Sequence, residues 1–186
     1  MKSTKTQSPL LRPVRVLDAV TEKTGRAIAW LNLPMVVLTC VVVALRYLFN
    51  TGSIALQETV MYLHATVFMI GAAYTLKHNE HVRVDIFYQR FSPRTKALVD
   101  LLGTLLLLVP MMGFIATQSW DYVAASWAVH EVSYEASGLP FVYVLKSLIL
   151  VMVVVMLLQA SAEILRNFCR LMGLDVPADL PETEGP

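Results

Sequence analysis

Four long apolar segments constrain the fold of this chain more strongly than any other feature of its sequence. They lie at about 27–49, 57–76, 97–118 and 140–164. A helix needs roughly 20 apolar residues to cross a hydrocarbon core about 30 Å thick, and each segment is that long. Charged residues make up only 16% of the chain, whereas soluble domains average about 25%. The sequence therefore predicts an all-α integral membrane protein with four transmembrane helices.

The remaining residues divide the chain into three parts. These are a basic N-terminal segment (1–26), a four-helix membrane domain (27–166) and a tail (167–186). The basic segment contains Pro13, and no small-residue cleavage site follows the first apolar segment, so we interpret that segment as a retained anchor and not a signal peptide.

The basic segment also contains a weak helical period. Val16, Val20 and Ala27 recur at near-helical spacing, which predicts a short amphipathic helix near 14–26 that lies in the membrane interface. The polar residues before Val14 and the Pro-rich, acidic residues after Gly173 are predicted to be flexible tails.

Turn and capping signals place the helix ends. The short run Asn50-Thr51-Gly52-Ser53 predicts a turn, so the first two spans form an antiparallel hairpin, with Ser53 as a helix cap. Ser92 followed by Pro93 is typical of an N-cap and first helical position. Pro140 is predicted to open the fourth span.

Prolines inside two spans predict irregular helices. Pro34 is expected to kink the first span near its start, and Pro110 with Gly113 is expected to bend the third.

The distribution of Lys and Arg predicts the orientation in the membrane. Thirteen of the 15 lie before the first span, between the second and third, or after the fourth. The loops at 50–56 and 120–139 contain none, and the second of these carries Asp121, Glu131 and Glu135. Because Lys and Arg are retained on the cytoplasmic side, both termini are predicted to be cytoplasmic. Aromatic residues gather at the opposite boundary, as in an aromatic belt: Trp120, Tyr122, Trp127, Tyr134, Phe141 and Tyr143.

The two remaining cations, Arg46 and Lys146, lie near the outer ends of the first and fourth spans. An unpaired charge in lipid is costly, so each needs a partner or a path to water. Arg46 lies about as deep as Glu58, which suggests an ion pair across the hairpin; the alternative is that Arg46 reaches the outer headgroups. Lys146 has three candidate partners: Glu135, Glu58 or a neighbouring subunit.

The spans lack the residues that many membrane functions require. The stretches 63–76, 101–118 and 141–162 contain no Asp or Glu, although proton and cation pathways commonly use intramembrane carboxylates. There is no inverted internal repeat of the kind found in many complete transporters.

No catalytic, cofactor-binding or metal-ligating constellation is present in the sequence. A haem anchor needs facing histidines, and His64 is the one histidine well inside a span; a lone membrane histidine more often forms an interhelical hydrogen bond. Cys40 and Cys169 show no redox or metal spacing and are interpreted as packing residues. The net charge of +1 indicates no nucleic-acid partner. We therefore expect no enzyme and no cofactor.

The loop after the second span reads Lys77-His78-Asn79-Glu80-His81-Val82-Arg83-Val84-Asp85. With an arginine ending the first span, a glutamate opening the second, and Gly138-Leu139-Pro140 before Lys146, the chain resembles the small-subunit family of TRAP transporters, often called DctQ. The resemblance extends over nearly the whole chain. It makes Arg46, Glu58, His81, Arg83, Asp85, Glu135 and Lys146 candidates for structural or interface roles.

The resemblance implies a three-part secondary transporter of the bacterial inner membrane. A periplasmic substrate-binding protein captures an organic acid, and a large membrane subunit couples its uptake to a sodium gradient. The small subunit resembles a scaffold for the large one, surrounded by membrane lipids, and docking of the binding protein is a further role in keeping with the resemblance. The principal alternative function is the membrane anchor of a respiratory complex that binds quinol or haem. A third alternative is a self-sufficient small transporter that assembles as a homo-oligomer.

The same loop shows a helical pattern of its own. Val84, Phe87, Tyr88 and Phe91 fall at i, i+3, i+4 and i+7, which favours a second interfacial helix near 82–91 over a solvated loop.

Overall fold

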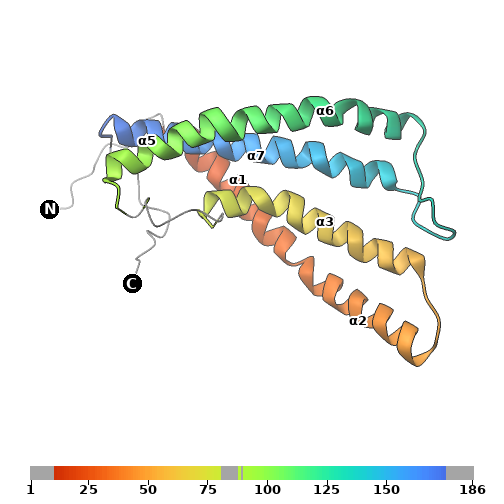
Figure 1. Ribbon diagram of the computed structural model, residues 1–186. Coiled ribbons are helices and arrows are strands. Elements are labelled where there is room, and N and C mark those ends of the chain that lie inside the picture. Colours follow the sequence, from red (N-terminus) through yellow and green to blue (C-terminus); the bar gives the residue numbers. More distant parts are fainter. Residues whose placement is uncertain (1–10, 81–87, 89, 175–186) are drawn as a thin grey trace.

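The computed structural model describes residues 11–80, 88 and 90–174, and this part of the chain is helical and contains no strand. The helices with described bounds are α1 (Leu11–Ala29), α2 (Asn32–Leu48), α3 (Ile54–Lys77), α5 (Pro93–Gly103), the π-helical turn η1 (Thr104–Leu108), α6 (Val109–Ala128) and α7 (Val142–Leu171) (Figure 1).

Four of the resulting helical stretches are long and apolar enough to cross a membrane. They are Arg12–Leu48, Ile54–Lys77, Pro93–Ala128 and Val142–Leu171. The predicted all-α membrane protein with four transmembrane helices is therefore confirmed.

The helices form an open bundle. The long helix made of α5, η1 and α6 lies beside α7, α3 lies along another side of α7, and α1 crosses behind them (Figure 1). Ala73 of α3 is buried against Met112 of α6 and against Val153 and Met156 of α7. This apolar cluster is where α3, α6 and α7 meet.

The helix α2 extends away from the rest of the bundle. It packs against α3, contains no buried residue, and diverges from α6 and α7 towards its C-terminal end (Figure 1). Half-buried residues recur at intervals of four and three from Leu31, just before α2, through Met35, Leu38, Val42 and Leu45, and Ala44 beside them is half-buried too. Residues at this spacing share one helix face, so this face is the seam with α3. The predicted antiparallel hairpin is present.

The prolines interrupt the helices as their chemistry requires. α1 and α2 are separated at Trp30 and Leu31. Pro34 lacks an N–H group and its ring clashes with the carbonyl four residues earlier, that of Trp30, so the break lies one turn before the proline. The π-helical turn η1 ends just before Pro110, where the predicted irregularity of the third span is found.

Both predicted serine caps are formed. Ser53 Oγ accepts a hydrogen bond from the Leu56 amide at 3.4 Å, and Ser92 Oγ accepts one from the Thr95 amide at 3.3 Å, with Pro93 as the first helical residue. The fourth span differs slightly from expectation, because α7 begins at Val142 and Pro140 lies in the loop before it.

The N-terminal prediction is partly corrected. A helix is present where the interfacial helix near 14–26 was predicted, but it begins at Leu11, inside the expected flexible tail, because Val14 packs against α7. The proposed helix near 82–91 and the acidic tail fall largely outside the described residues.

Candidate functional site: polar clusters at the two ends of the bundle

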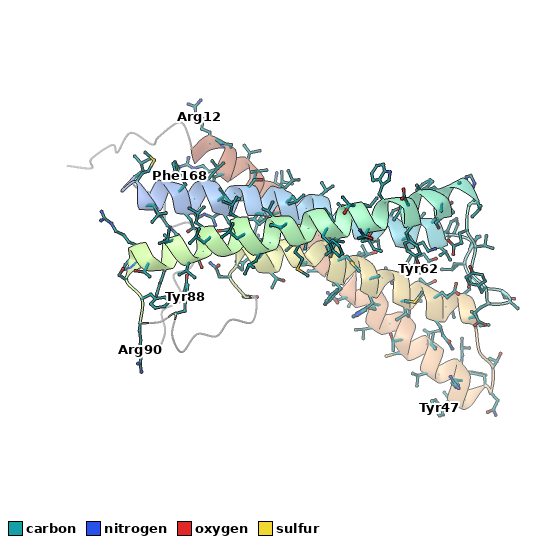
Figure 2. All side chains as sticks on the ribbon, turned by 45° about the horizontal axis from the view of Figure 1, so that its top comes forward. Arg12, Tyr47, Tyr62, Tyr88, Arg90 and Phe168 are labelled. Carbon is teal, nitrogen blue, oxygen red and sulfur yellow. The ribbon has the colours of Figure 1, made fainter. Side chains whose placement is uncertain are left out.

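Polar contacts gather at opposite ends of the bundle. The first, here called the basic end, comprises α1, the end of α3, the start of α5 and the end of α7. The second, the loop end, comprises the turn between α2 and α3 and the loop 129–141 between α6 and α7. Figure 2 shows Arg12 and Phe168 at the basic end and Tyr47 at the far end of α2.

A closed ring of hydrogen bonds joins α1 to α7 at the basic end. Arg166 donates to Asp18 through Nη2 at 2.6 Å and to Glu163 through Nη1 at 2.5 Å. Gln159 Nε2 donates to Asp18 and to Glu163, each at 3.2 Å, and Thr21 Oγ1 donates to Gln159 Oε1 at 2.8 Å. Arg166 is 3% exposed and Gln159 is fully buried. We call these five residues the Arg166 ring.

The geometry explains why the ring tolerates burial. A buried charge is costly unless it is paired and hydrogen-bonded. Arg166 meets two carboxylates, and Gln159 donates to both of them, so the buried acceptors are satisfied. The residues of α1 and α7 that bond to each other lie 138 to 148 positions apart in the sequence. The ring therefore fixes how α1 lies on α7.

A second set of ionic contacts joins α1 to α3. Glu22 Oε2 accepts from Lys77 Nζ at 2.6 Å and lies 3.0 Å from His78 Nε2, while its Oε1 accepts from Arg26 at 2.7 Å. Lys77 is 8% exposed. Glu22 thus anchors the C-terminal end of α3, and cations at that end also suit the helix dipole.

Close approach of two helices accompanies these contacts. A side chain at Gly25 would overlap the ring of Tyr74. Tyr74 in turn packs on His78, with 4.3 Å between ring centroids. Gly25 is therefore required by the contact between α1 and α3.

Glu58 organises the loop end. Its Oε1 accepts from Ser133 Oγ, and its Oε2 accepts from the backbone amide of Leu139 at 2.5 Å. A side chain at Gly138 would overlap both Ser133 and Glu58. The first turn of α3 is thereby joined to the loop 129–141.

Lys146 joins the same loop to α7. Its Nζ lies 2.5 Å from Glu131 Oε2 and 4.0 Å from the centroid of the Tyr122 ring. The Lys146 ammonium lowers the pKa of Glu131 below its ordinary value. Beside this pair, Trp127 Nε1 donates to Ser147 Oγ at 2.7 Å. These contacts connect the ends of α6 and α7 to the loop.

The partners of Glu58 and Lys146 differ from those that the sequence suggested. The suggested ion pair between Arg46 and Glu58 is not formed within the described part of the chain; Arg46 is exposed, and Glu58 is turned towards the loop. Lys146 pairs with Glu131 and not with Glu135, whose side chain is exposed. His81, Arg83 and Asp85 lie outside the described residues.

Sequence reasoning missed the Arg166 ring. In the sequence, Arg166 counts only among the basic residues after the fourth span that predict the orientation, and no prediction rests on Asp18, Gln159 or Glu163. A signal existed, because Gln159, Glu163 and Arg166 fall at i, i+4 and i+7 and so share one face of the last turns of a span.

The described histidines have separate surroundings. His78 contacts Glu22, His130 packs edge-on against Tyr143, and the His64 ring stacks on Phe68 of its own helix. Within residues 11–80, 88 and 90–174, no group of three or more His, Cys, Asp or Glu side chains is arranged to bind a metal ion. The clusters at the two ends are arranged to hold helices together.

Comparison with known families decides the assignment. Residues 35–170 match the family model described as "Tripartite ATP-independent periplasmic transporters, DctQ component". The chain belongs to the DctQ family. No curated protein and no solved structure matches it. The resemblance drawn from the loop motif is therefore confirmed.

Membership makes the chain the small membrane subunit of a TRAP transporter. In the DctQ family this component works with a large membrane subunit and a periplasmic binding protein. The matched region includes α2 from Met35 onwards, α3, α5, η1 and α6 and nearly all of α7, and it begins after α1. Within the ring, Asp18 and Thr21 of α1 thus lie outside the match, whereas Gln159, Glu163 and Arg166 lie inside it.

Proposed function

We propose that this DctQ subunit is a noncatalytic scaffold for the large subunit of an importer that takes up an organic acid with a sodium gradient. The observation that carries the scaffold role is the placement of its carboxylates. The stretches 32–48, 59–77, 101–120 and 142–162 hold neither Asp nor Glu. Glu58 and Glu163, which flank these stretches, are occupied by contacts that join elements of the bundle.

Carboxylates placed at the ends of the spans are suited to a scaffold and not to a transport pathway. An ion or proton pathway needs exchangeable polar groups near mid-membrane. Here the paired charges stand at the ends of the spans. Sodium coupling and recognition of an organic acid are therefore assigned to the other two components, by analogy with the family.

The proposed orientation places both termini in the cytoplasm of a bacterial cell, with the loop 129–141 on the periplasmic side. The support is the distribution of basic residues, since Arg12, Arg15, Lys23, Arg94 and Arg170 are exposed at the basic end. The loop would then face the periplasmic binding protein, and docking of that protein is part of the proposal.

Single-cysteine labelling tests the orientation. In a background without the two native cysteines, Tyr134→Cys should react with an impermeant maleimide added to intact spheroplasts, because Tyr134 is 94% exposed in the loop. Arg94→Cys should react only after the membrane is opened. Labelling of Arg94→Cys in sealed spheroplasts would overturn the orientation.

Transport assays test the scaffold role. Proteoliposomes should be prepared with this chain alone, the large subunit alone, and both, each supplied with the loaded binding protein and a panel of radiolabelled mono- and dicarboxylates. Uptake driven by a sodium gradient is expected only when the large subunit is present, and at a higher rate with both. Uptake by this chain alone would refute the proposal.

A further inference from the structure

One face of α3 is exposed over about half of the helix, from Gln57 to Phe68. Gln57, Met61, His64 and Phe68 are all exposed, with Phe68 at 69%. Their spacing of four, three and four residues places them in one line along the helix. We call these four residues the α3 stripe.

The stripe contains a polar group in the middle of a span. His64 is the eleventh of the 24 residues of α3, so it lies near the centre of the helix. Within the described part of the chain it forms no hydrogen bond or ion pair, and its ring stacks on Phe68 with 6.3 Å between centroids. An imidazole carries both a donor and an acceptor, and leaving them unpaired in hydrocarbon is costly.

Other exposed faces of the bundle differ in this respect. On the long helix formed by η1 and α6, Leu106, Leu107, Met111 and Phe114 are exposed and apolar. The hydroxyl of Thr117, which is also exposed, already donates to the carbonyl of Phe114 in the same helix at 2.9 Å. Lipid tails satisfy such a surface completely. They offer no hydrogen-bonding partner to His64, so lipid is a poor occupant of the α3 stripe.

The spacing of the stripe is that of a helix seam. α2 packs on α3 through residues separated by the same intervals of four and three, from Leu31 to Leu45. Within the chain, this spacing thus already forms one contact between transmembrane helices, that of α2 with α3. The α3 stripe repeats it on a face that no helix of the described chain covers.

We propose that the α3 stripe is the contact face for a transmembrane helix of the large subunit, and that this helix places a hydrogen-bonding group opposite His64. This inference rests on the proposed function, because it takes the large subunit to be the partner. Polar side chains hydrogen-bond between transmembrane helices and fix which helices associate and at what depth. The partner chemistry is therefore an apolar helix with one Ser, Thr, Asn, Gln or acidic side chain near mid-membrane.

Site-specific photocrosslinking in the assembled complex tests the contact. A photoreactive phenylalanine analogue replaces Met61 or Phe68 in the stripe, and Leu107 of η1 or Phe114 of α6 as controls. The chain carries an affinity tag and is co-expressed with the large subunit. Adducts to the large subunit are expected from the two stripe positions and not from the two controls.

Substitution of His64 tests the hydrogen bond. His64→Leu should lower recovery of the large subunit with the tagged chain about three- to tenfold, which corresponds to about 0.6 to 1.4 kcal/mol for one interhelical hydrogen bond. His64→Asn keeps a donor and an acceptor and should retain most of the complex. Thr117→Leu is the control and should be neutral, because the hydroxyl of this exposed residue of α6 donates to the Phe114 carbonyl of its own helix.

The outcomes distinguish failure of the proposed contact face from failure of the proposed scaffold function. If the complex forms but the stripe positions give no adduct, or adducts arise only at the controls, the stripe is not the contact. An adduct between two copies of this chain would assign the stripe to self-association and overturn the proposal. If the tagged chain recovers no large subunit at all, the proposed function itself fails, and the inference with it.

Discussion

The contribution of the Arg166 ring to the packing of α1 on α7 can be measured through the labelling rate of one native thiol, that of Cys169. Cys169 is a free thiol, 2% exposed, and packs in the same cluster as Val14 of α1. Its reaction with a maleimide therefore requires α1 to move away from α7. We expect Arg166→Met to increase the rate of Cys169 labelling, because the substitution leaves the carboxylates of Asp18 and Glu163 without their cation.

The expected magnitude follows from the burial of the ring. Removing one partner of a buried ion pair costs roughly 3 to 5 kcal/mol. The Asp18 side chain is 22% exposed, so water relieves part of the penalty and the lower end of that range applies. Where opening is rapid and reversible, the labelling rate follows the opening equilibrium. Since about 1.4 kcal/mol is a factor of ten, the rate should rise on the order of a hundredfold.

The assay uses the purified protein in detergent or nanodiscs with Cys40 replaced by alanine, since Cys40 is exposed on α2. Arg170→Met is the matched control, one turn further along α7, where Arg170 is exposed. Asp18→Asn, introduced on the other helix, should also accelerate labelling. The triple variant Asp18→Asn, Glu163→Gln, Arg166→Met should recover much of the protection, because neutral polar groups replace the stranded charges.

Two results would refute this reasoning. If Arg166→Met labels no faster than Arg170→Met, the ring does not hold α1 on α7. If the triple variant labels as fast as Arg166→Met, the loss arises from altered packing near Cys169 and not from uncompensated charge.

Two further predictions concern the contacts beside the ring and at the loop end. Gly25→Ala should accelerate Cys169 labelling, since a methyl group there overlaps Tyr74 and overpacking costs about 1–3 kcal/mol, whereas Gly71→Ala, with open space around it, should leave the rate unchanged. Folding favours the deprotonated form of Glu131, because the pKa of this carboxyl in the folded state lies below the ordinary 4.5. The stability that the Glu131 carboxylate contributes is therefore present above pH 4.5 and is lost as the pH falls through the folded-state pKa. The thermal midpoint should fall on acidification, and Lys146→Met should reduce that fall; an identical acid dependence in Lys146→Met would contradict the assignment.

The sequence predicts the helices of this fold well because their signals are local. Ser53 and Ser92 cap helices where their position before an apolar segment indicates, and the break before α2 follows from Pro34. Length and apolar content are sufficient for the four spans. The bilayer restricts each span to one geometry, so no tertiary information is needed at this level.

The candidate site was predicted less well because it depends on how each helix is rotated about its axis. Arg46 and Glu58 were paired from their similar depth. Depth does not determine direction, and the rotation of α3 turns Glu58 towards Ser133 in a loop 75 residues away. The partners of Arg166 were equally inaccessible to sequence reasoning. Its spacing from Glu163 indicates a shared face, but only the packing of α1 on α7 brings Asp18 to that face.

The same rotation connects the two clusters with the proposed contact face. α3 is held at its C-terminal end by Lys77 and His78, which contact Glu22, and at its N-terminal end by Glu58, which contacts the loop. Because both ends are bound, α3 has little freedom to turn about its axis, and the α3 stripe faces a constant direction. Contacts at the ends of the bundle would thus position a surface at its middle. Glu22→Gln and Glu58→Gln, although distant from the stripe, should therefore weaken assembly with the large subunit. If only His64→Leu weakens assembly, the stripe binds the large subunit without help from the contacts at the two ends of α3.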